Sequence, residues 1–248
     1  MKADSVCVDA VRPAVNFNDR KSDIDILLLH YTGMNGGQAA EDWLCAEESG
    51  VSCHYIIHED GRIVQMVAEA DRAYHAGAGS WEGREDVNSR AIGVEIVNDG
   101  HGPEGALPPP FPVVQMQAVA ALSRDIIARH AVAPHRVLAH SDTAPGRKID
   151  PGETFDWDWL AEQGVGQVHP AVPVRSGRFL TPGENGQPVE ALQAMLAMFG
   201  YGIEPNGTYD ERTRIVVEAF QRHHRRALVD GVADASTIET IHGLLAMR

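Results

Sequence analysis

The stretch Ile26-Leu27-Leu28-Leu29-His30 decides the fold class of the first part of this chain. Consecutive apolar residues that end at a histidine are typical of a buried strand whose end reaches a polar edge. A second run of this kind, Val137-Leu138-Ala139, ends at His140. Strands buried on both faces need helices to cover the sheet. We therefore expect an α/β fold with a mixed central sheet flanked by helices.

The segments around these strands carry further signals. Residues 51–58 and 62–67 alternate around Asp60-Gly61, a dipeptide that favours a hairpin. Residues 91–98 indicate another strand, and residues 99–112, rich in glycine and proline, indicate a loop. Helices are expected at residues 37–49 and 113–130. Their expected core-facing residues are Ala40, Trp43 and Leu44 in the first, and Met116, Val119, Ala120, Ile126 and Ile127 in the second.

Three polar residues suit a metal ion. His30 and His140 end apolar strands, and Asp150 follows in a Lys-Ile-Asp-Pro-Gly turn. A lone histidine at a strand end is more often a hydrogen-bonded residue than a ligand, so the interpretation depends on the whole set. Two imidazoles and one carboxylate fill three positions of a tetrahedral Zn²⁺ site and leave the fourth for water. A site that is open in this way is catalytic rather than structural.

The order of short motifs along residues 20–165 resembles the zinc-dependent N-acetylmuramoyl-L-alanine amidases of the phage-lysozyme and peptidoglycan-recognition superfamily. The resemblance implies a bound Zn²⁺ and hydrolysis of the amide between N-acetylmuramic acid and L-alanine. The motifs that carry it are His30-Tyr31-Thr32-Gly33, Val51-Ser52-Cys53-His54-Tyr55, Tyr74-His75-Ala76-Gly77, Ile92-Gly93-Val94-Glu95-Ile96-Val97-Asn98, His140-Ser141-Asp142 and Lys148-Ile149-Asp150.

Two residues are expected to carry the proton and charge chemistry. Glu95 lies in the middle of a strand, where a carboxylate is costly unless it faces a polar cleft. The resemblance places a general acid and base there, although a structural salt bridge is the alternative. Lys148 is the expected stabiliser of the oxyanion, and its alternative role is to neutralise an acidic rim.

The remaining motif residues are assigned around the metal. The resemblance places His75 near the substrate, and we expect Tyr55 and Asn98 to contact substrate as well. His54 is expected to be a hydrogen-bonded residue behind the ligands. Phage-type members carry a tyrosine where this chain has Cys53, so the catalytic contribution of that tyrosine is not transferred and Glu95 must bear more of it.

The C-terminal part predicts a second domain. Three short amphipathic segments, residues 187–199, 210–225 and 235–245, must bury their apolar stripes against one another. They resemble the three-helix peptidoglycan-binding module of wall hydrolases, and a generic helical accessory domain is the alternative. We expect a catalytic domain at residues 1–166, a linker at 167–183 and the helical domain at 184–248. Because every proposed catalytic residue precedes the linker, we expect the helical domain to supply only a second attachment.

Composition limits the partners and the compartment. Of the net charge of −14, residues 1–174 contribute 13 basic against 26 acidic side chains, and this acidity argues against nucleic acid as a partner. No apolar run approaches the ~20 residues of a membrane span. Three cysteines cannot form a disulfide framework. The first residues lack an apolar signal region, so we expect a soluble cytoplasmic protein, or a periplasmic or envelope protein if a leader has been removed.

Two other functions remain open at this stage. A non-catalytic peptidoglycan-recognition protein would keep the fold but lose a metal ligand. A zinc peptidase that acts on the stem peptide would keep the ligands and cut a different amide. For the enzyme itself, the partner is either polymeric peptidoglycan or a 1,6-anhydro-muropeptide.

Overall fold

The computed structural model describes residues 1–170, 172–174 and 179–248. These residues form two compact units that interleave along the chain. Unit 1 comprises residues 1–77, 86–140 and 150–166, and unit 2 comprises residues 78–85, 141–149 and 167–248. None of the described helices is both long and apolar enough to cross a membrane.

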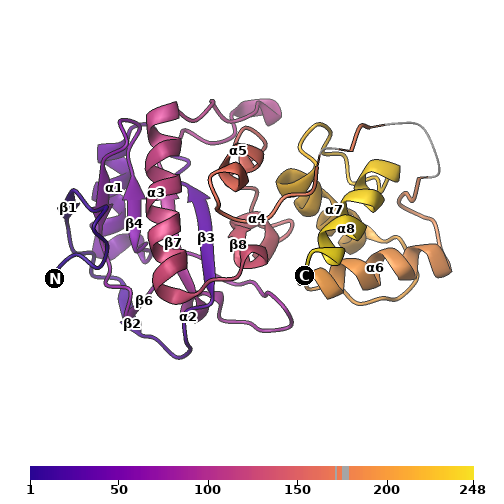
Figure 1. Ribbon diagram of the computed structural model, residues 1–248, viewed down its shortest axis with the longest axis horizontal. Helices are drawn as coiled ribbons and strands as arrows, with labels where there is room; N and C mark the ends of the chain where they lie inside the picture. Colours follow the sequence, from indigo (N-terminus) through magenta and orange to yellow (C-terminus); the bar gives the residue numbers. More distant parts are fainter. Residues whose placement is uncertain (171, 175–178) are drawn as a thin grey trace. The chain divides into compact units, whose positions relative to one another are not determined.

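Unit 1 is built on a six-stranded mixed sheet of order β1-β5-β4-β7-β3-β8 (Figure 1). Only β4 and β5 pair antiparallel, through the hairpin at Asp60-Gly61, and the other neighbours are parallel. The strands β2 and β6 form a separate antiparallel pair. The bounds are β1 Ala10–Val11, β2 Phe17–Asp19, β3 Ile26–Tyr31, β4 Tyr55–Ile57, β5 Ile63–Gln65, β6 Asp71–Ala73, β7 Ala91–Ile96 and β8 Val137–Ala139.

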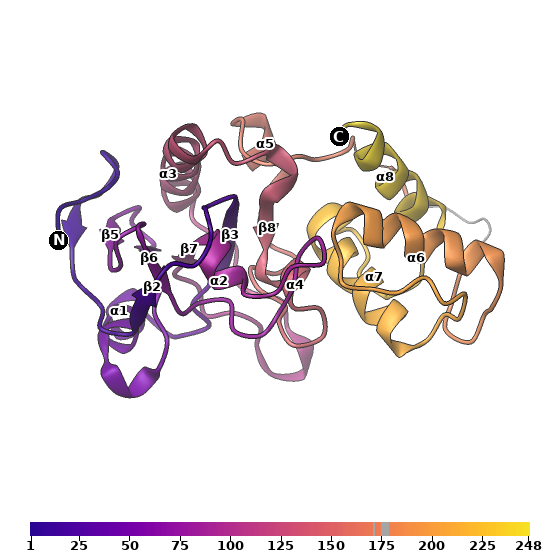
Figure 2. The same ribbon diagram turned by 90° about the horizontal axis from the view of Figure 1, so that it is seen from below.

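Helices cover both faces of this sheet. Helix α3, Val113–His130, lies on one side of the strands and α1, Gly37–Cys45, on the other (Figure 2). The side chain of Gln115 fixes α3 by donating to the carbonyls of Ile57 and Val97, at 3.1 and 2.8 Å. Unit 1 also contains α2 Val87–Arg90, α5 Trp157–Glu162, and the short 3₁₀ helices η1 Glu47–Ser49, η2 Pro103–Gly105 and η3 Pro134–Arg136.

The register across the sheet decides which side chains share a face. Tyr55 donates to Glu69, which in turn is bound by Arg129 of α3, so Tyr55 points to the α3 face. Ile56 points to the opposite face because side chains alternate along a strand. Glu95 pairs with Ile56 and with His30, so these three side chains form one row on the face away from α3.

Unit 2 combines three helices with two earlier segments of the chain, residues 78–85 and 141–149, which we call excursions. The helices are α6 Gln187–Phe199, α7 Glu211–His224 and α8 Ala235–Ala246. The short helix α4, His140–Thr143, begins at His140 of unit 1, and its other residues belong to unit 2. Asp210 and Asp234 cap α7 and α8 through the backbone N–H groups of Thr213 and Thr237.

The fold class expected from sequence is confirmed, including the mixed sheet, the flanking helices and the three C-terminal helices. One core assignment was wrong: Trp43 is 45% exposed, and Glu41, two residues earlier, is buried instead. In α8 the buried leucine is Leu244. The expected linker, 167–183, includes residues 171 and 175–178, which lie outside the described residues.

Candidate active site

Three side-chain atoms from different parts of unit 1 converge in its interior. His30 Nδ1 lies 2.9 Å from His140 Nδ1 and 3.1 Å from Asp150 Oδ2, and the last two atoms are 3.0 Å apart. The three residues are 1%, 2% and 5% exposed. His30 comes from β3, and His140 follows β8, the neighbour of β3, so the sheet itself brings the two imidazoles together.

The hydrogen bonds of the two Nε2 atoms define which nitrogen of each imidazole carries the proton. His140 Nε2 lies 2.8 Å from the carbonyl oxygen of Ala76, which can only accept, so Nε2 carries the proton and Nδ1 offers a lone pair. His30 Nε2 lies 3.1 Å from His75 Nδ1. If His30 donates there, its Nδ1 also offers a lone pair to the centre. Three acceptor atoms then face one another, an arrangement that is stable only around a cation.

The donor set fits zinc. Ligand atoms at about 2.0–2.1 Å from a tetrahedral ion lie roughly 3.3 Å from one another, close to the separations of the three atoms. An aspartate carboxylate is ionised at neutral pH and is a ligand that zinc accepts. Asp150 therefore adds an anionic donor to the two imidazoles. Among the described residues, these three form the group of metal-binding side chains with this geometry.

His75 lies directly behind His30. Burial, followed by the nearby His30, lowers the pKa of His75 well below its ordinary value, so its ring is neutral and Nδ1 can accept from His30. Its Nε2 is buried, with no hydrogen-bond partner within the described parts of the chain. Gly93 makes room for this ring, since a Cβ there would lie 2.3 Å from His75 Cγ. The contact of His75 with substrate stays a prediction, and Nε2 is the atom available for it.

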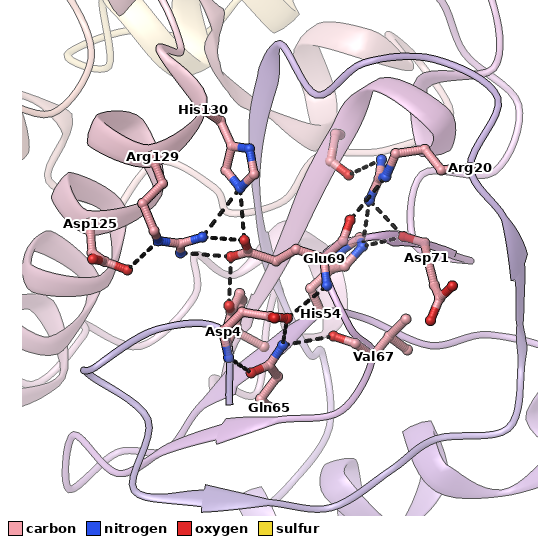
Figure 3. A network of polar contacts seen from close by, with 12 residues as sticks. Asp4, Arg20, His54, Gln65, Val67, Glu69, Asp71, Asp125, Arg129 and His130 are labelled. Atoms are coloured by element: carbon pink, nitrogen blue, oxygen red, sulfur yellow. Dashed lines mark hydrogen bonds and ion pairs between the residues drawn. The ribbon is translucent and has the colours of Figure 1, made fainter. Parts of the chain in front are cut away.

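His54 belongs to a polar network that also contains Arg20 and Asp71 (Figure 3). Its Nδ1 accepts from the backbone N–H of Gly93 at 2.9 Å, and its Nε2 lies 2.9 Å from Arg20. Burial, with the Arg20 charge second, lowers the pKa of His54 to about 3. Arg20 also donates to five carbonyls, those of Glu69, Asp71, Asn88, Ser89 and Ala91. Burial lowers the pKa of Arg20 only to about 10, so it stays charged.

Glu95 lies on β7 beside His30 on the same face of the sheet. It is partly exposed, unlike its apolar neighbours Val94 and Ile96. Its position in the sheet therefore brings a carboxylate next to the strand that carries His30. Burial, with the Glu95 charge second, raises the pKa of the Cys53 thiol, so Cys53 is a neutral side chain here.

Lys148 belongs to the segment between His140 and Asp150. Its backbone N–H donates to the carbonyl of Ala144 at 3.0 Å, which closes a turn. The side chain is partly exposed. Its ammonium forms neither an ion pair nor a hydrogen bond in the described ranges 1–170, 172–174 and 179–248. It is therefore available to a substrate, and its role stays a prediction.

Tyr55 and Asn98 have internal partners. Tyr55 is fully buried on the α3 face and donates to Glu69 at 2.6 Å. Asn98 donates to the carbonyl of Pro109 at 2.8 Å and accepts from the backbone N–H of Gly100 at 2.9 Å. Both side chains therefore have hydrogen-bond partners within the protein, and their contact with substrate stays a prediction.

Sequence reasoning missed Arg20 and the role of Gly93. An arginine in a polar segment carries no local sign that it will be buried. A glycine inside an apolar strand does carry one, because it often marks a close approach by another group. The carbonyl of Ala76, which orients His140, is a backbone group and has no signature in the sequence.

Comparison with known proteins agrees with this geometry. Residues 20–153 match the N-acetylmuramoyl-L-alanine amidase family model, and this segment contains all three converging residues. The chain belongs to the N-acetylmuramoyl-L-alanine amidase family. It is an amide hydrolase by that membership, and residues 185–241 match the model of a peptidoglycan binding domain.

Individual members of the amidase family are similar over most of the chain. N-acetylmuramoyl-L-alanine amidase AmiD of Escherichia coli strain K12 is 36% identical over 90% of this chain and 82% of its own length. The structure of Escherichia coli AmiD in complex with anhydro-N-acetylmuramic acid-L-Ala-D-gamma-Glu-L-Lys has a TM-score of 0.77 at 34% identity, covering 95% of this chain and 93% of that one. The 1,6-anhydro-N-acetylmuramyl-L-alanine amidase AmpD of Haemophilus influenzae is 31% identical over 61% of this chain and 89% of its own length.

Replacing Gly93 by alanine tests the packing behind His30. The new Cβ would displace the His75 ring, so we expect zinc affinity to fall on the order of 10–100-fold, the range for groups that orient a ligand. Zinc affinity is measured by competition with a chromogenic chelator.

The double variant Gly93→Ala/His75→Ala serves as the control. If the alanine acts through the His75 ring, the double variant binds zinc no more weakly than His75→Ala alone. Additive losses would show that Gly93 acts on the site by another route.

Proposed function

We propose that this chain is a zinc-dependent hydrolase of the amide between N-acetylmuramic acid, or its 1,6-anhydro form, and L-alanine. The observation that carries the proposal is the convergence of His30, His140 and Asp150 through three buried acceptor atoms. Membership of the amidase family and the bound ligand of the similar AmiD structure support the choice of substrate.

His30, His140 and Asp150 would hold the ion through their buried, converging ligand atoms. Zinc bound there supplies a Lewis acid that lowers the pKa of water and polarises a carbonyl. Ala76 and His75 keep the two imidazoles oriented through their outer nitrogens. The protein therefore defines both the position and the protonation state of each ligand.

Glu95 is the proposed carrier of the proton. A carboxylate beside the ligand strand can accept a proton from the attacking water and return it to the amine of L-alanine as the amide breaks. Lys148, whose ammonium has no partner among the described residues, would stabilise the negative charge that develops on the carbonyl oxygen. In this proposal Glu95 transfers the proton and Lys148 balances the negative charge on the carbonyl oxygen.

The two alternative functions differ from this proposal in separate ways. A recognition protein without activity would lack a ligand, whereas all three are present and converge. A stem-peptide hydrolase would have the same ligands, so only product analysis separates it from the amidase. We further propose that residues 185–241 bind peptidoglycan, on the basis of the family match. The cytoplasmic location stays a prediction.

We expect one zinc ion per chain, removed by chelators together with the activity. His30→Ala, His140→Ala and Asp150→Ala should each lose stoichiometric metal, because three protein ligands are the minimum for an open tetrahedral site. Metal content is measured by mass spectrometry of the purified variants. His130→Ala, which removes a histidine bound to Glu69 on the α3 side, is the matched control and should keep its zinc. A ligand variant that retains one equivalent of zinc would be removed from the proposed set.

Glu95→Gln should keep the fold and the metal and lose turnover by about 10²–10⁴-fold, because the amide has the same shape but cannot take a proton. Glu69→Gln is the control. That carboxylate is buried and bound to Tyr55, Arg129 and His130, so its loss should lower the melting temperature with little change in kcat. A Glu95→Gln enzyme within about threefold of the wild-type rate would assign the proton transfer to another group.

The bond is identified from the products of a soluble 1,6-anhydro-muropeptide and of intact sacculi. Mass spectrometry should detect the free anhydro sugar together with a peptide that begins at L-alanine. A product that retains L-alanine on the sugar would instead identify a stem-peptide hydrolase. Release from sacculi at a rate comparable to the soluble substrate would favour polymeric peptidoglycan as the substrate.

A further inference from the structure

The segment 141–149 connects two proposed metal ligands, His140 and Asp150, and carries Lys148. It packs as part of unit 2, together with the three C-terminal helices, whereas both ligands belong to unit 1. The chain between the ligands therefore takes its conformation from contacts with the helical part of the protein.

Asp142 makes the central contact of this segment. Its carboxylate is fully buried. Tyr201, just after α6, donates to Asp142 Oδ1 at 2.6 Å, and His223 of α7 lies with its Nδ1 2.6 Å from Asp142 Oδ2. Tyr201 and His223 are themselves 2% and 4% exposed. A buried carboxylate is stable only when such donors are present, so these contacts specify where Asp142 can lie.

A second excursion is held in the same way. Residues 78–85 begin two residues after Ala76, whose carbonyl orients His140. Trp81 is fully buried, with its ring centroid 5.1 Å from that of Tyr201 and 6.1 Å from that of Phe199. Gly200 permits this packing, because a Cβ there would lie 2.5 Å from the Trp81 ring.

The two excursions are also bound to each other. The backbone N–H of Ser80 donates to the carbonyl of Thr143 at 2.9 Å. A Cβ on Gly79 would lie 2.5 Å from the same oxygen, so the two backbones approach as closely as a glycine allows. Tyr201 contacts both excursions, one through its ring and the other through its hydroxyl.

We propose that Tyr201 and His223 are positioning residues for the reaction, because through Asp142 they hold segment 141–149, which carries Lys148 and leads directly to Asp150. By holding this segment, Tyr201 and His223 determine the backbone conformation that leads to Asp150 and the position of Lys148. This role rests on the proposed function of Asp150 as a zinc ligand and of Lys148 as the stabiliser of the oxyanion. It differs from the expectation that the helical domain supplies only a second attachment.

Tyr201→Phe in the full-length protein is the main test, and Tyr209→Phe is its matched control. Both tyrosines are buried in unit 2, at 2% and 1% exposure. Both lose one hydroxyl hydrogen bond, but Tyr209 donates to the carbonyl of Gly231, within the C-terminal segment. The pair therefore separates the loss of the Asp142 contact from a general loss of stability in the helical unit.

The first readout is hydrogen–deuterium exchange of peptides that cover residues 141–149, measured below the unfolding transition. Tyr201→Phe should speed exchange there about tenfold, since a hydrogen bond to a charged group is worth roughly that factor or more, and Tyr209→Phe should not. Equal exchange in the two variants would overturn the proposal.

The second readout is kinetic and uses a soluble muropeptide, for which wall attachment is irrelevant. Tyr201→Phe should lower kcat about tenfold with KM within about twofold, and should raise the zinc dissociation constant by about tenfold. His223→Ala should behave alike, and His223→Asn, which restores a donor near Nδ1, should recover part of the loss. Variants that match Tyr209→Phe in kcat and in zinc affinity would show that the helical unit does not act on the site.

A double-variant cycle checks that the effect passes through Asp142. Asp142→Asn combined with Tyr201→Phe should be no slower than the more impaired single variant, because both remove the same contact. Independent, multiplying losses would contradict this route. A wild-type protein without amidase activity would disprove the proposed function, while the exchange measurement would still decide whether Tyr201 holds segment 141–149.

Discussion

The structure depends on one electrostatic constraint, the meeting of His30 Nδ1, His140 Nδ1 and Asp150 Oδ2 in a buried space. Two imidazoles and a carboxylate present lone pairs to one another there, and none of the three residues is more than 5% exposed. Such a cluster is costly in a protein interior unless a cation lies at its centre. The sheet, the loop before Asp150 and the carbonyl of Ala76 all serve to hold this arrangement against its own repulsion.

Buried polar residues around His30 explain how its ring is held in this orientation. His75 is neutral because it is buried next to His30, so its Nδ1 can accept a hydrogen bond from His30 Nε2 and thereby keep the His30 proton on the side away from the centre. His54 and the Gly93 backbone lie behind His75, and Arg20 ties the surrounding carbonyls together (Figure 3). His75 is hydrogen-bonded to His30, whereas His54 contacts His75 by ring packing, with 5.5 Å between the ring centroids.

Sequence alone predicts those parts of this design that have local periodicity or a motif. Helix α3 was predicted with its bounds, 113–130, because its apolar stripe is long, and the three ligands follow from strand ends and a known order of motifs. On the nine-residue helix α1, the spacing predicted the burial of Ala40 and Leu44 correctly and failed only for Trp43. Trp43 is exposed while Glu41 is buried, because Arg12, His58 and Arg62 supply partners for the carboxylate. Such compensation depends on distant residues and cannot be read from a local pattern.

The division of the chain by family does not coincide with its division by packing. The amidase match ends at residue 153 and the peptidoglycan-binding match begins at 185, yet residues 78–85 and 141–149 pack in the unit that contains the later segment. A loop between two metal ligands has few conformations that satisfy both ends, and the buried Asp142 selects among them. Under the proposed role of Tyr201 and His223, a substitution of His223 in α7 would alter the loop between His140 and Asp150, although α7 contributes no ligand atom.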